Sequence, residues 1–468
     1  MACYRKTSIL LLLITLLGFL ATCESQPSEP EPPFPTSVRI SPEVNVIPFG
    51  SSLQFSAVVL DQYGETVPGE PVSWSSPQGS SVTIDSDGLA TTVSSGEGTV
   101  TATAASISAS TTVTVDPLLF ASISSGNEHT CALTTTGAAY CWGSGGSGQL
   151  GDGTTENRSI PGPVSGGLTF SSIDAGNSHT CALTGEGVAY CWGTGSTGQL
   201  GTGSTEVHTT PGRVSGGHVF ESISSSSFHT CGVTTSGEGF CWGHGTYYKL
   251  GNGSYEDRLE PSPVSGGIEW SGISTGWLHT CGLSTEDKGY CWGAGNFGRI
   301  GNGSTDKIHQ PVPAEVIGEI AFESISAGGN SGCGIDLEGA THCWGGINAI
   351  VYGMGEDIGI PTQMDAGIQF SSISLWWHAC ALIPAGDAYC WGPGGHGALG
   401  NGGVLDSTTP VSVSGNLSFS SVSAGEQFTC GVTVGGGAYC WGLGEVGQLG
   451  NGLTEDQTIP VPVLGGPG

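Results

Sequence analysis

Fourteen of the sixteen cysteines in this 468-residue chain form seven pairs, and the two cysteines of each pair are ten residues apart. The first pair lies in "HTCALTTTGAAYCWG" (129–143), and a Trp-Gly dipeptide follows the second cysteine of every pair. Paired thiols can form a disulfide, bind a metal ion or act as nucleophiles. Which of these chemistries applies depends on the secondary structure that positions the two cysteines of each pair.

The residues between the cysteines predict a tight β-hairpin. The loop would be 135–137, a type I turn whose last residue adopts the left-handed conformation. That last position is Gly137 in the first copy, glycine in five others and Asp287 in one. The resulting register places the two cysteines opposite each other with Cα atoms roughly 4.5 Å apart, within disulfide reach. The pairs are Cys131–Cys141, Cys181–Cys191, Cys231–Cys241, Cys281–Cys291, Cys333–Cys343, Cys380–Cys390 and Cys430–Cys440.

We therefore expect seven disulfides, which an exported protein can keep. Each would close an eleven-residue ring and contribute about 2–3 kcal/mol at best. Free or metal-bound thiols are the alternative, but zinc sites use shorter spacings between cysteines on a knuckle.

Each hairpin belongs to a repeat of about fifty residues, a period typical of solenoids and propellers. Each copy of the repeat contains an aromatic-x-x-(Ile/Val) strand, the hairpin, a Gly-rich loop and a Pro-x-x-Val strand. Together these suit one four-stranded propeller blade. The hairpin tryptophans are expected in the core. The last Pro-x-x-Val strand, 459–463, is expected to complete the blade begun at Phe120. Copies start at Phe120, Phe170, Phe220, Trp270, Phe322, Phe370 and Phe419.

The segment "FSSIDAGNSHTCALTGEGVAYCWGTGSTGQLGTG" (170–203) resembles the repeat of the regulator of chromosome condensation family. The resemblance extends from Phe120 to about Val463 and implies a seven-bladed β-propeller. The family's best-known eukaryotic member is a guanine-nucleotide exchange factor of the nucleus and cytosol, a role that does not suit an exported chain. Other members are secreted bacterial proteins that clasp a partner, including an enzyme inhibitor.

The N-terminal segment predicts export. Residues 1–23 have a charged start and a short apolar core, as in a signal peptide. "LATC" (20–23) resembles the lipobox of bacterial lipoproteins, so Cys23 is a candidate for lipidation, with ordinary signal-peptidase cleavage as the alternative. Residues 24–35 are rich in Pro and Glu and predict an extended tether.

Residues 36–116 read as short alternating strands separated by turns, which favours a small β-sandwich with Trp74 in its core. "DSDGLATTVSSGEGTVTATA" (85–104) resembles the bacterial Ig-like domain of group 2, a family that usually serves as a spacer or adhesive module. Asp85 and Asp87 are interpreted as turn residues rather than calcium ligands. The predicted fold is therefore all-β, an Ig-like sandwich followed by a seven-bladed propeller at 118–468.

Charge and composition exclude several functions. With a net charge of −30 and no cluster of Lys or Arg, the chain is not expected to bind nucleic acid, or a membrane other than through a lipid anchor at Cys23. No cofactor or metal site is predicted. Calcium in the Gly-rich loops 151–157 and 301–307 is a minor alternative.

A structural hydrogen bond inside each blade is expected for the histidines that recur at one position, His129, His179, His229, His279 and His378.

The candidate partner-binding residues lie at positions where single copies differ from the common repeat sequence. Large aromatic or apolar side chains replace small ones in two loops that should share one face of the ring, and such anchors suit a protein or a glycan partner. Local packing against a neighbouring blade is the alternative. The residues are Phe228, Trp277, Leu278, Trp376, Trp377, Phe428, Tyr247 and Tyr248.

These features predict an exported protein, tethered to the bacterial cell envelope or secreted, that binds a protein or glycan at the cell surface and has no catalytic activity. No nucleophile, metalloprotease or phosphate-loop motif is present. The alternatives are a secreted inhibitor, a structural or adhesive surface protein, a nucleotide-exchange regulator by family analogy, and an enzyme acting on polysaccharides.

Overall fold

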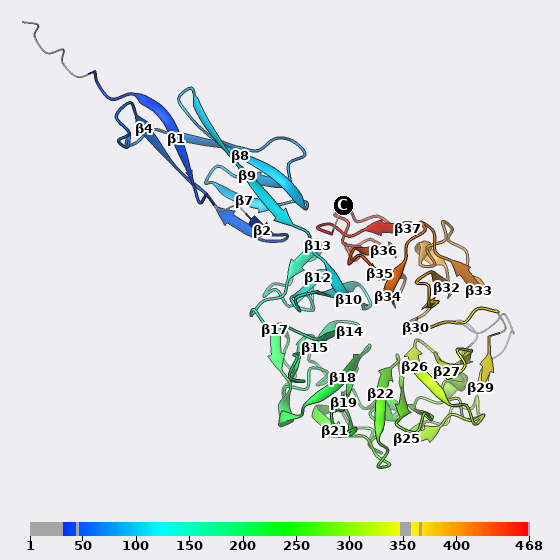
Figure 1. The fold of residues 1–468 in the computed structure, drawn as a ribbon. Coiled ribbons are helices and arrows are strands. Elements are labelled where there is room, and N and C mark those ends of the chain that lie inside the picture. The colour runs from blue at the N-terminus through cyan, green and yellow to red at the C-terminus, as the bar shows by residue number, and fades with distance from the viewer. Residues whose placement is uncertain (1–30, 44–45, 347–356, 365–366, 467–468) are drawn as a thin grey trace, which may run out of the picture.

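The computed structural model describes residues 31–43, 46–346, 357–364 and 367–466. The predicted signal peptide 1–23, the lipidation candidate Cys23 and most of the tether 24–35 lie outside these residues. The described part of the chain folds into a sandwich and a ring of sheets (Figure 1). None of its helices is long and apolar enough to span a bilayer.

The sandwich forms because its strands alternate buried apolar and exposed polar residues, which gives each sheet one face to bury. Phe55 is buried in its core and contacts the half-buried Trp74 at 6.3 Å between ring centroids. The Asp85 carboxylate accepts hydrogen bonds from the N–H groups of Asp87 and Leu89, which is turn geometry as predicted. The strands are β1 (Pro35–Ser41), β2 (Val46–Pro48), β3 (Ser52–Gln54), β4 (Ser56–Asp61), β5 (Val72–Ser75), β6 (Val82–Ile84), β7 (Leu89–Thr92), β8 (Gly96–Ala104) and β9 (Ile107–Asp116).

Seven four-stranded antiparallel sheets form the ring, and each is built from one uninterrupted stretch of chain. Figure 1 shows the first strand of each blade nearest the centre and the fourth at the rim. Blades 1 to 4 comprise β10 (Phe120–Ser125), β11 (His129–Thr134), β12 (Ala139–Gly143), β13 (Arg158–Pro163); β14 (Ser172–Ala175), β15 (His179–Leu183), β16 (Ala189–Gly193), β17 (His208–Arg213); β18 (Phe220–Ser225), β19 (His229–Thr234), β20 (Gly239–Gly243), β21 (Arg258–Pro263); and β22 (Trp270–Thr275), β23 (His279–Ser284), β24 (Gly289–Gly293), β25 (Gln310–Glu315).

Blades 5 to 7 repeat the same order, and four short 3-10 turns lie in the connecting loops. The strands are β26 (Phe322–Gly328), β27 (Ser331–Asp336), β28 (Thr341–Gly345), β29 (Ile358–Gln363); β30 (Ser372–Leu375), β31 (Ala379–Leu382), β32 (Ala388–Gly392), β33 (Ser407–Ser412); and β34 (Phe419–Ala424), β35 (Phe428–Thr433), β36 (Ala438–Gly442), β37 (Gln457–Pro462). The turns are η1 (Ser215–Gly217), η2 (Thr246–Tyr248), η3 (Asn296–Gly298) and η4 (Gly395–Gly397).

The predicted hairpin register is confirmed. Cys131 pairs with Cys141 and Ala132 with Tyr140, and Gly137 ends the turn with φ of +83°. A side chain at that φ would strain the backbone, which explains the glycine. All seven predicted disulfides are present, each with Cα atoms 4.1 Å apart, and all seven hairpin tryptophans are fully buried.

Four of the five recurring histidines join neighbouring blades, so the prediction of a bond inside each blade was wrong. The Nε2 atom of His129 lies 2.9 Å from the hydroxyl of Thr180 in blade 2. That hydroxyl donates its only proton to the carbonyl of Gln149, so the histidine nitrogen must donate to Thr180. The same bond links His179 to Thr230, His229 to Thr280 and His378 to Thr429.

The ring closes differently from the sequence-based expectation. Strand β37 completes its own blade 7 and does not join the blade begun at Phe120. Blade 7 instead packs on blade 1 side by side, with both Thr130 Oγ1 and Trp142 Nε1 donating to the carbonyl of Gln448 at 2.9 Å. Six of the seven copies have the Pro-x-x-Val pattern and the fifth has Pro361-x-x-Met364, so nothing in the last copy distinguishes its fourth strand from the others.

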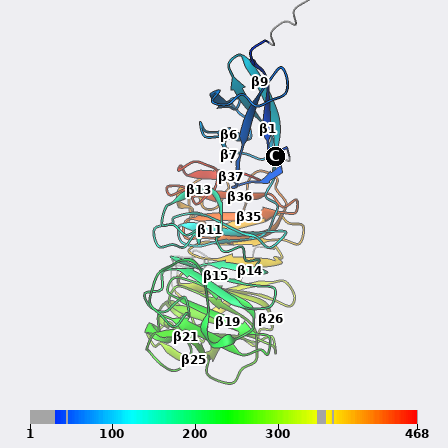
Figure 2. The same ribbon diagram turned by 90° about the vertical axis from the view of Figure 1, so that its left-hand side faces the viewer.

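The sandwich reinforces this closure. It extends outward from the rim beside β13 and β37 (Figures 1 and 2). The fully buried Phe49 covers Gly465, where even a Cβ would lie 2.4 Å from the phenyl ring. The N–H of Leu118 donates to the carbonyl of Gly465 at 2.6 Å, tying the start of the ring to its end. A single core cluster therefore runs from the sandwich into blades 1 and 7.

We expect Phe49→Ala to destabilise the propeller and not only the sandwich, by about 3 kcal/mol, because a buried phenyl ring at the junction is lost. Eleven of the twelve tryptophans lie outside the sandwich, so tryptophan fluorescence during urea unfolding reports on the ring. Phe34→Ala is the matched control, since Phe34 directly precedes β1 and is 48% exposed. Equal midpoints for the two variants would show that the sandwich is only a spacer.

Candidate binding face

Two kinds of loop project from the same face of the ring. In an antiparallel blade, the loop between the first and second strands and the loop between the third and fourth strands lie at the same end. In blade 1 they touch, because the N–H of Ser144 donates to the carbonyl of Glu128 at 2.8 Å. We call this side the loop face. All the predicted partner-binding residues lie in or beside its loops.

Two of the predicted tryptophans meet on this face although they come from non-adjacent blades. Trp277 of blade 4 and Trp377 of blade 6 contact edge to face, with ring centroids 5.2 Å apart. They approach each other over the blade 5 loop, where a Cβ on Gly329 would lie 2.9 Å from the Trp377 ring. The glycine thus makes room for the pair. Both indoles and the neighbouring Leu278 are half-buried.

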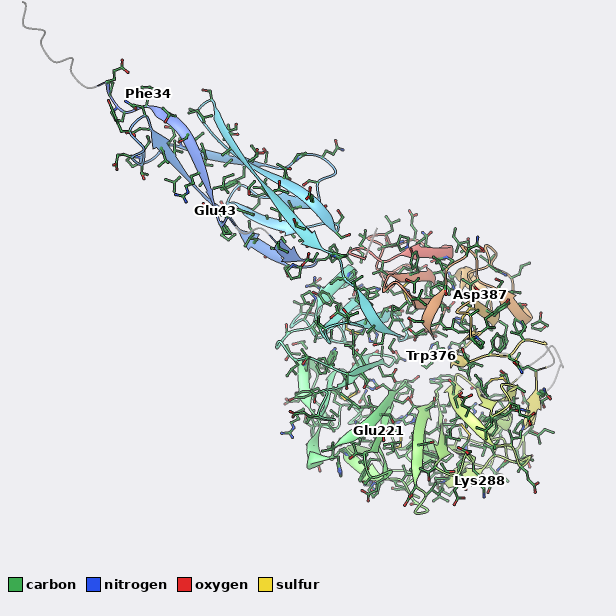
Figure 3. All side chains as sticks on the ribbon, viewed as in Figure 1. Phe34, Glu43, Glu221, Lys288, Trp376 and Asp387 are labelled. Atoms are coloured by element: carbon green, nitrogen blue, oxygen red, sulfur yellow. A yellow bond between two sulfur atoms is a disulfide. The ribbon has the colours of Figure 1, made fainter. Side chains whose placement is uncertain are left out.

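Trp376 takes a different position. It lies at the inner edge of the ring (Figure 3) and lines the end of the central channel. Its neighbour Trp377 points instead to a pocket between blades 6 and 7. The adjacent tryptophans therefore serve different surfaces.

Phe228 belongs to a third aromatic group, in blade 3. It is 37% exposed, contacts His244 at 5.9 Å between ring centroids, and lies 5.8 Å from Lys249 Nζ. Lys249 is buried and also hydrogen-bonds His244 Nδ1 at 3.1 Å. Burial lowers the pKa of Lys249 to about 8. This lysine is thus a positive charge held under an aromatic surface.

Tyr247 and Tyr248 form a cluster with two residues that the sequence analysis did not select, Tyr255 and His309. The ring centroids are 4.9 Å apart for Tyr248–Tyr255 and 5.1 Å for Tyr247–His309. Both predicted tyrosines have φ near +60°, where non-glycine residues are uncommon. A sequence signal existed, since Tyr255 stands where the first copy has Thr155.

Phe428 was predicted wrongly as a partner-binding residue. Its side chain is fully buried in the core cluster at the ring closure. It occupies the position of the recurring histidines, beside Cys430 on β35. The phenyl ring replaces the blade-to-blade histidine bond with apolar packing, so its role is structural.

The central channel is lined at one level by six serines and one aspartate. Each first strand contributes one of these side chains, and six of the seven accept a hydrogen bond from a backbone N–H of the next blade. Asp174 Oδ2, for example, accepts from the N–H of Ser225, and Ser124 Oγ accepts from the N–H of Ala175 at 2.9 Å. Burial raises the pKa of Asp174 to about 6. The serines are Ser124, Ser224, Ser274, Ser326, Ser374 and Ser423.

Among the described residues, no group of three or more His, Cys, Asp or Glu side chains is placed to hold a metal ion. In the Gly-rich loop 151–157, the Asp152 carboxylate accepts from the N–H and hydroxyl of Thr154 and pairs with Arg158. These contacts are turn chemistry and use the oxygens that calcium would need.

Comparison with protein families supports this architecture. A model of the RCC1-like domain matches residues 78–376, and a model of the regulator of chromosome condensation (RCC1) repeat matches 385–432 and 435–468. A model of the bacterial Ig-like domain (group 2) matches 34–115.

Among curated relatives, the ultraviolet-B receptor UVR8 of Arabidopsis thaliana is 32% identical over 130 residues, which are 26% of this chain and 30% of the receptor. The mitochondrial RCC1 domain-containing protein RUG3 of the same plant is 29% identical over 95 residues, 19% of this chain and 21% of RUG3. The chain thus spans less than a third of either relative.

Solved structures show the same fold. Human WBSCR16 superposes with a TM-score of 0.63 at 20% identity, covering 69% of this chain and 89% of that one. Prp20p of Saccharomyces cerevisiae gives 0.62 at 21% identity, covering 75% and 86%. Since the RCC1-like model alone spans more than half of the sequence, the chain belongs to the RCC1-like domain family, with a bacterial Ig-like domain preceding its propeller.

Proposed function

We propose that this chain is an exported, non-catalytic binding protein whose loop face recognises a protein partner. The observation that carries the proposal is that the Trp277–Trp377 pair and the exposed Phe228 lie on that face, on loops held by the ring. Half-buried aromatic side chains on a fixed scaffold are typical anchors of protein interfaces.

The family supports a protein-binding or regulatory role. One solved structure shows yeast RCC1 (Prp20) bound by Kap60, and another concerns the binding of Prp20p to Gsp1p and histones. Those partners belong to the yeast protein. For this chain, seven disulfides and the Ig-like domain favour an oxidising compartment outside the cytosol. Anchoring through Cys23 and attachment to the cell envelope remain part of the proposal.

The channel supports the non-catalytic part of the proposal. Hydrolases that act on polysaccharides use a pair of carboxylates flanking the scissile bond. Among the described residues that line the channel, Asp174 is the sole carboxylate, and its oxygens accept hydrogen bonds within the ring.

The test is capture of partners from extracts of neighbouring cells by the tagged, oxidised protein. We expect Trp277→Ala and Trp377→Ala to lower capture at least tenfold, since anchor residues are worth about 2 kcal/mol or more. Their melting temperatures should change by less than about 5 °C.

Leu337→Ala is the control, because Leu337 is 60% exposed in the hairpin turn on the opposite face. Unchanged capture by both tryptophan variants would refute the proposal. A large fall in melting temperature would instead assign these indoles to the core.

A further inference from the structure

A pocket opens on the loop face between blades 6 and 7. It encloses about 270 Å³ and is lined by Trp377, Pro393, Gly395, Ala398, Glu426 and Gln427. Pockets for drug-sized ligands are larger, about 300–1,000 Å³. A single extended side chain therefore matches this space better than a whole small molecule. We call it the Trp377 pocket.

The walls of the Trp377 pocket are apolar and aromatic. Pro393 and Ala398 provide aliphatic surface, and Trp377 provides an indole. The indole is fixed from two directions. Trp277 contacts it at 5.2 Å between ring centroids, and its own side chain donates a hydrogen bond to the Glu426 carboxylate. An aromatic ring held in this way attracts a cation placed over its face.

Glu426 places a negative charge in the same pocket. It is half-buried and lies near a second carboxylate, Glu128 of blade 1, and both effects raise its pKa, with burial the larger. None of the ion pairs within the described residues involves Glu426 or Glu128. A partly desolvated carboxylate facing a like charge is unfavourable until a cation joins it.

We propose that the Trp377 pocket receives a lysine or arginine side chain of the protein partner. This inference rests on the proposed function. The aliphatic stem of the incoming residue lies along Pro393 and Ala398, and its charged end lies between the Trp377 indole and the Glu426 carboxylate. The net charge of −30 favours the approach of a basic partner segment.

The experiment uses the full, oxidised protein labelled with fluorotryptophan. Each of its twelve tryptophans then gives one ¹⁹F resonance. Trp377→Phe assigns the resonance of interest. The probes are N-acetyl-arginine amide and N-acetyl-lysine amide, with N-acetyl-citrulline amide as the neutral analogue. We expect the cationic probes to shift the Trp377 resonance saturably, with a dissociation constant on the order of millimolar, and citrulline to leave it unchanged.

Glu426→Gln should weaken binding of the cationic probes at least tenfold, while its amide oxygen can still accept from the Trp377 indole. Glu186→Gln is the matched control and should change binding less than threefold, because Glu186 is exposed in a hairpin turn on the opposite face of the ring. Equal shifts with citrulline, or an unaffected Glu426→Gln, would overturn the inference. If Glu426→Gln still captures the partner while Trp277→Ala does not, the proposed function stands and only this pocket assignment falls.

Discussion

Reduction of the seven disulfides is expected to unfold the propeller in urea concentrations that the oxidised protein withstands. Each bond closes a hairpin of eleven residues and is worth about 2–3 kcal/mol through the entropy of the unfolded chain. Seven such bonds together are worth on the order of 15–20 kcal/mol. That sum exceeds the typical free energy of unfolding of a whole domain, about 5–15 kcal/mol.

The measurement compares urea unfolding of the oxidised protein with that of protein reduced in denaturant and kept in reductant. Thiol titration of the unfolded protein counts the free cysteines. The roughly fourteen thiols of the hairpin cysteines should be detected only after reduction. Replacing a single pair, Cys231→Ser with Cys241→Ser, should cost about 3 kcal/mol and leave the ring folded. A reduced protein with the same urea midpoint as the oxidised one would contradict the expectation.

Acidification from pH 7.5 to pH 5 is expected to cost the propeller on the order of 10 kcal/mol of stability. Five buried histidines have pKa values lowered by burial, to about 3 for His129 and His279 and about 4 for His179 and His378, with His229 also well below its usual value. In the unfolded chain each returns to about 6.5.

The sign follows from this depression. The folded ring holds the histidines neutral, so its stability is complete above pH 6.5 and falls as the pH drops toward the folded pKa values. At pH 5, each histidine costs about 2 kcal/mol, since one pKa unit equals about 1.4 kcal/mol. Asp174 opposes the trend, because its pKa is raised to about 6 and the folded state binds its proton more tightly than the unfolded state.

Urea unfolding at a series of pH values measures the effect, with the disulfides left intact. His179→Ser introduces the residue that blade 5 has at this position. It should reduce the slope of the unfolding free energy against pH by the equivalent of about one bound proton. Asp174→Ser should steepen the loss, because it removes the opposing group. Stability that is flat between pH 7.5 and pH 5 would show that the histidines are not held neutral.

Local patterns predicted the fold well because each repeat contains its own instructions. The glycine at the turn and the equal distance of both cysteines from it determine the hairpin register within one copy. The seven copies then determine the number of blades. What one copy cannot show is its relation to the next, so the partner of His129 in blade 2 and the closure beside Phe49 were not predicted.

The candidate site was only partly predictable for the same reason. Comparing copies identified Trp277 and Trp377, but their contact depends on Gly329 in the blade between them. Phe428 looked like one more aromatic loop residue, yet its place on β35 buries it. Glu426 lies in an ordinary polar loop, and only the pocket geometry connects it with Trp377.

Because every blade consists of a single continuous segment, none of the described sheets depends on strands from both ends of the chain. Duplication or deletion of about fifty residues therefore adds or removes one whole unit without splitting another. Each unit can also acquire its own loops independently of the other six.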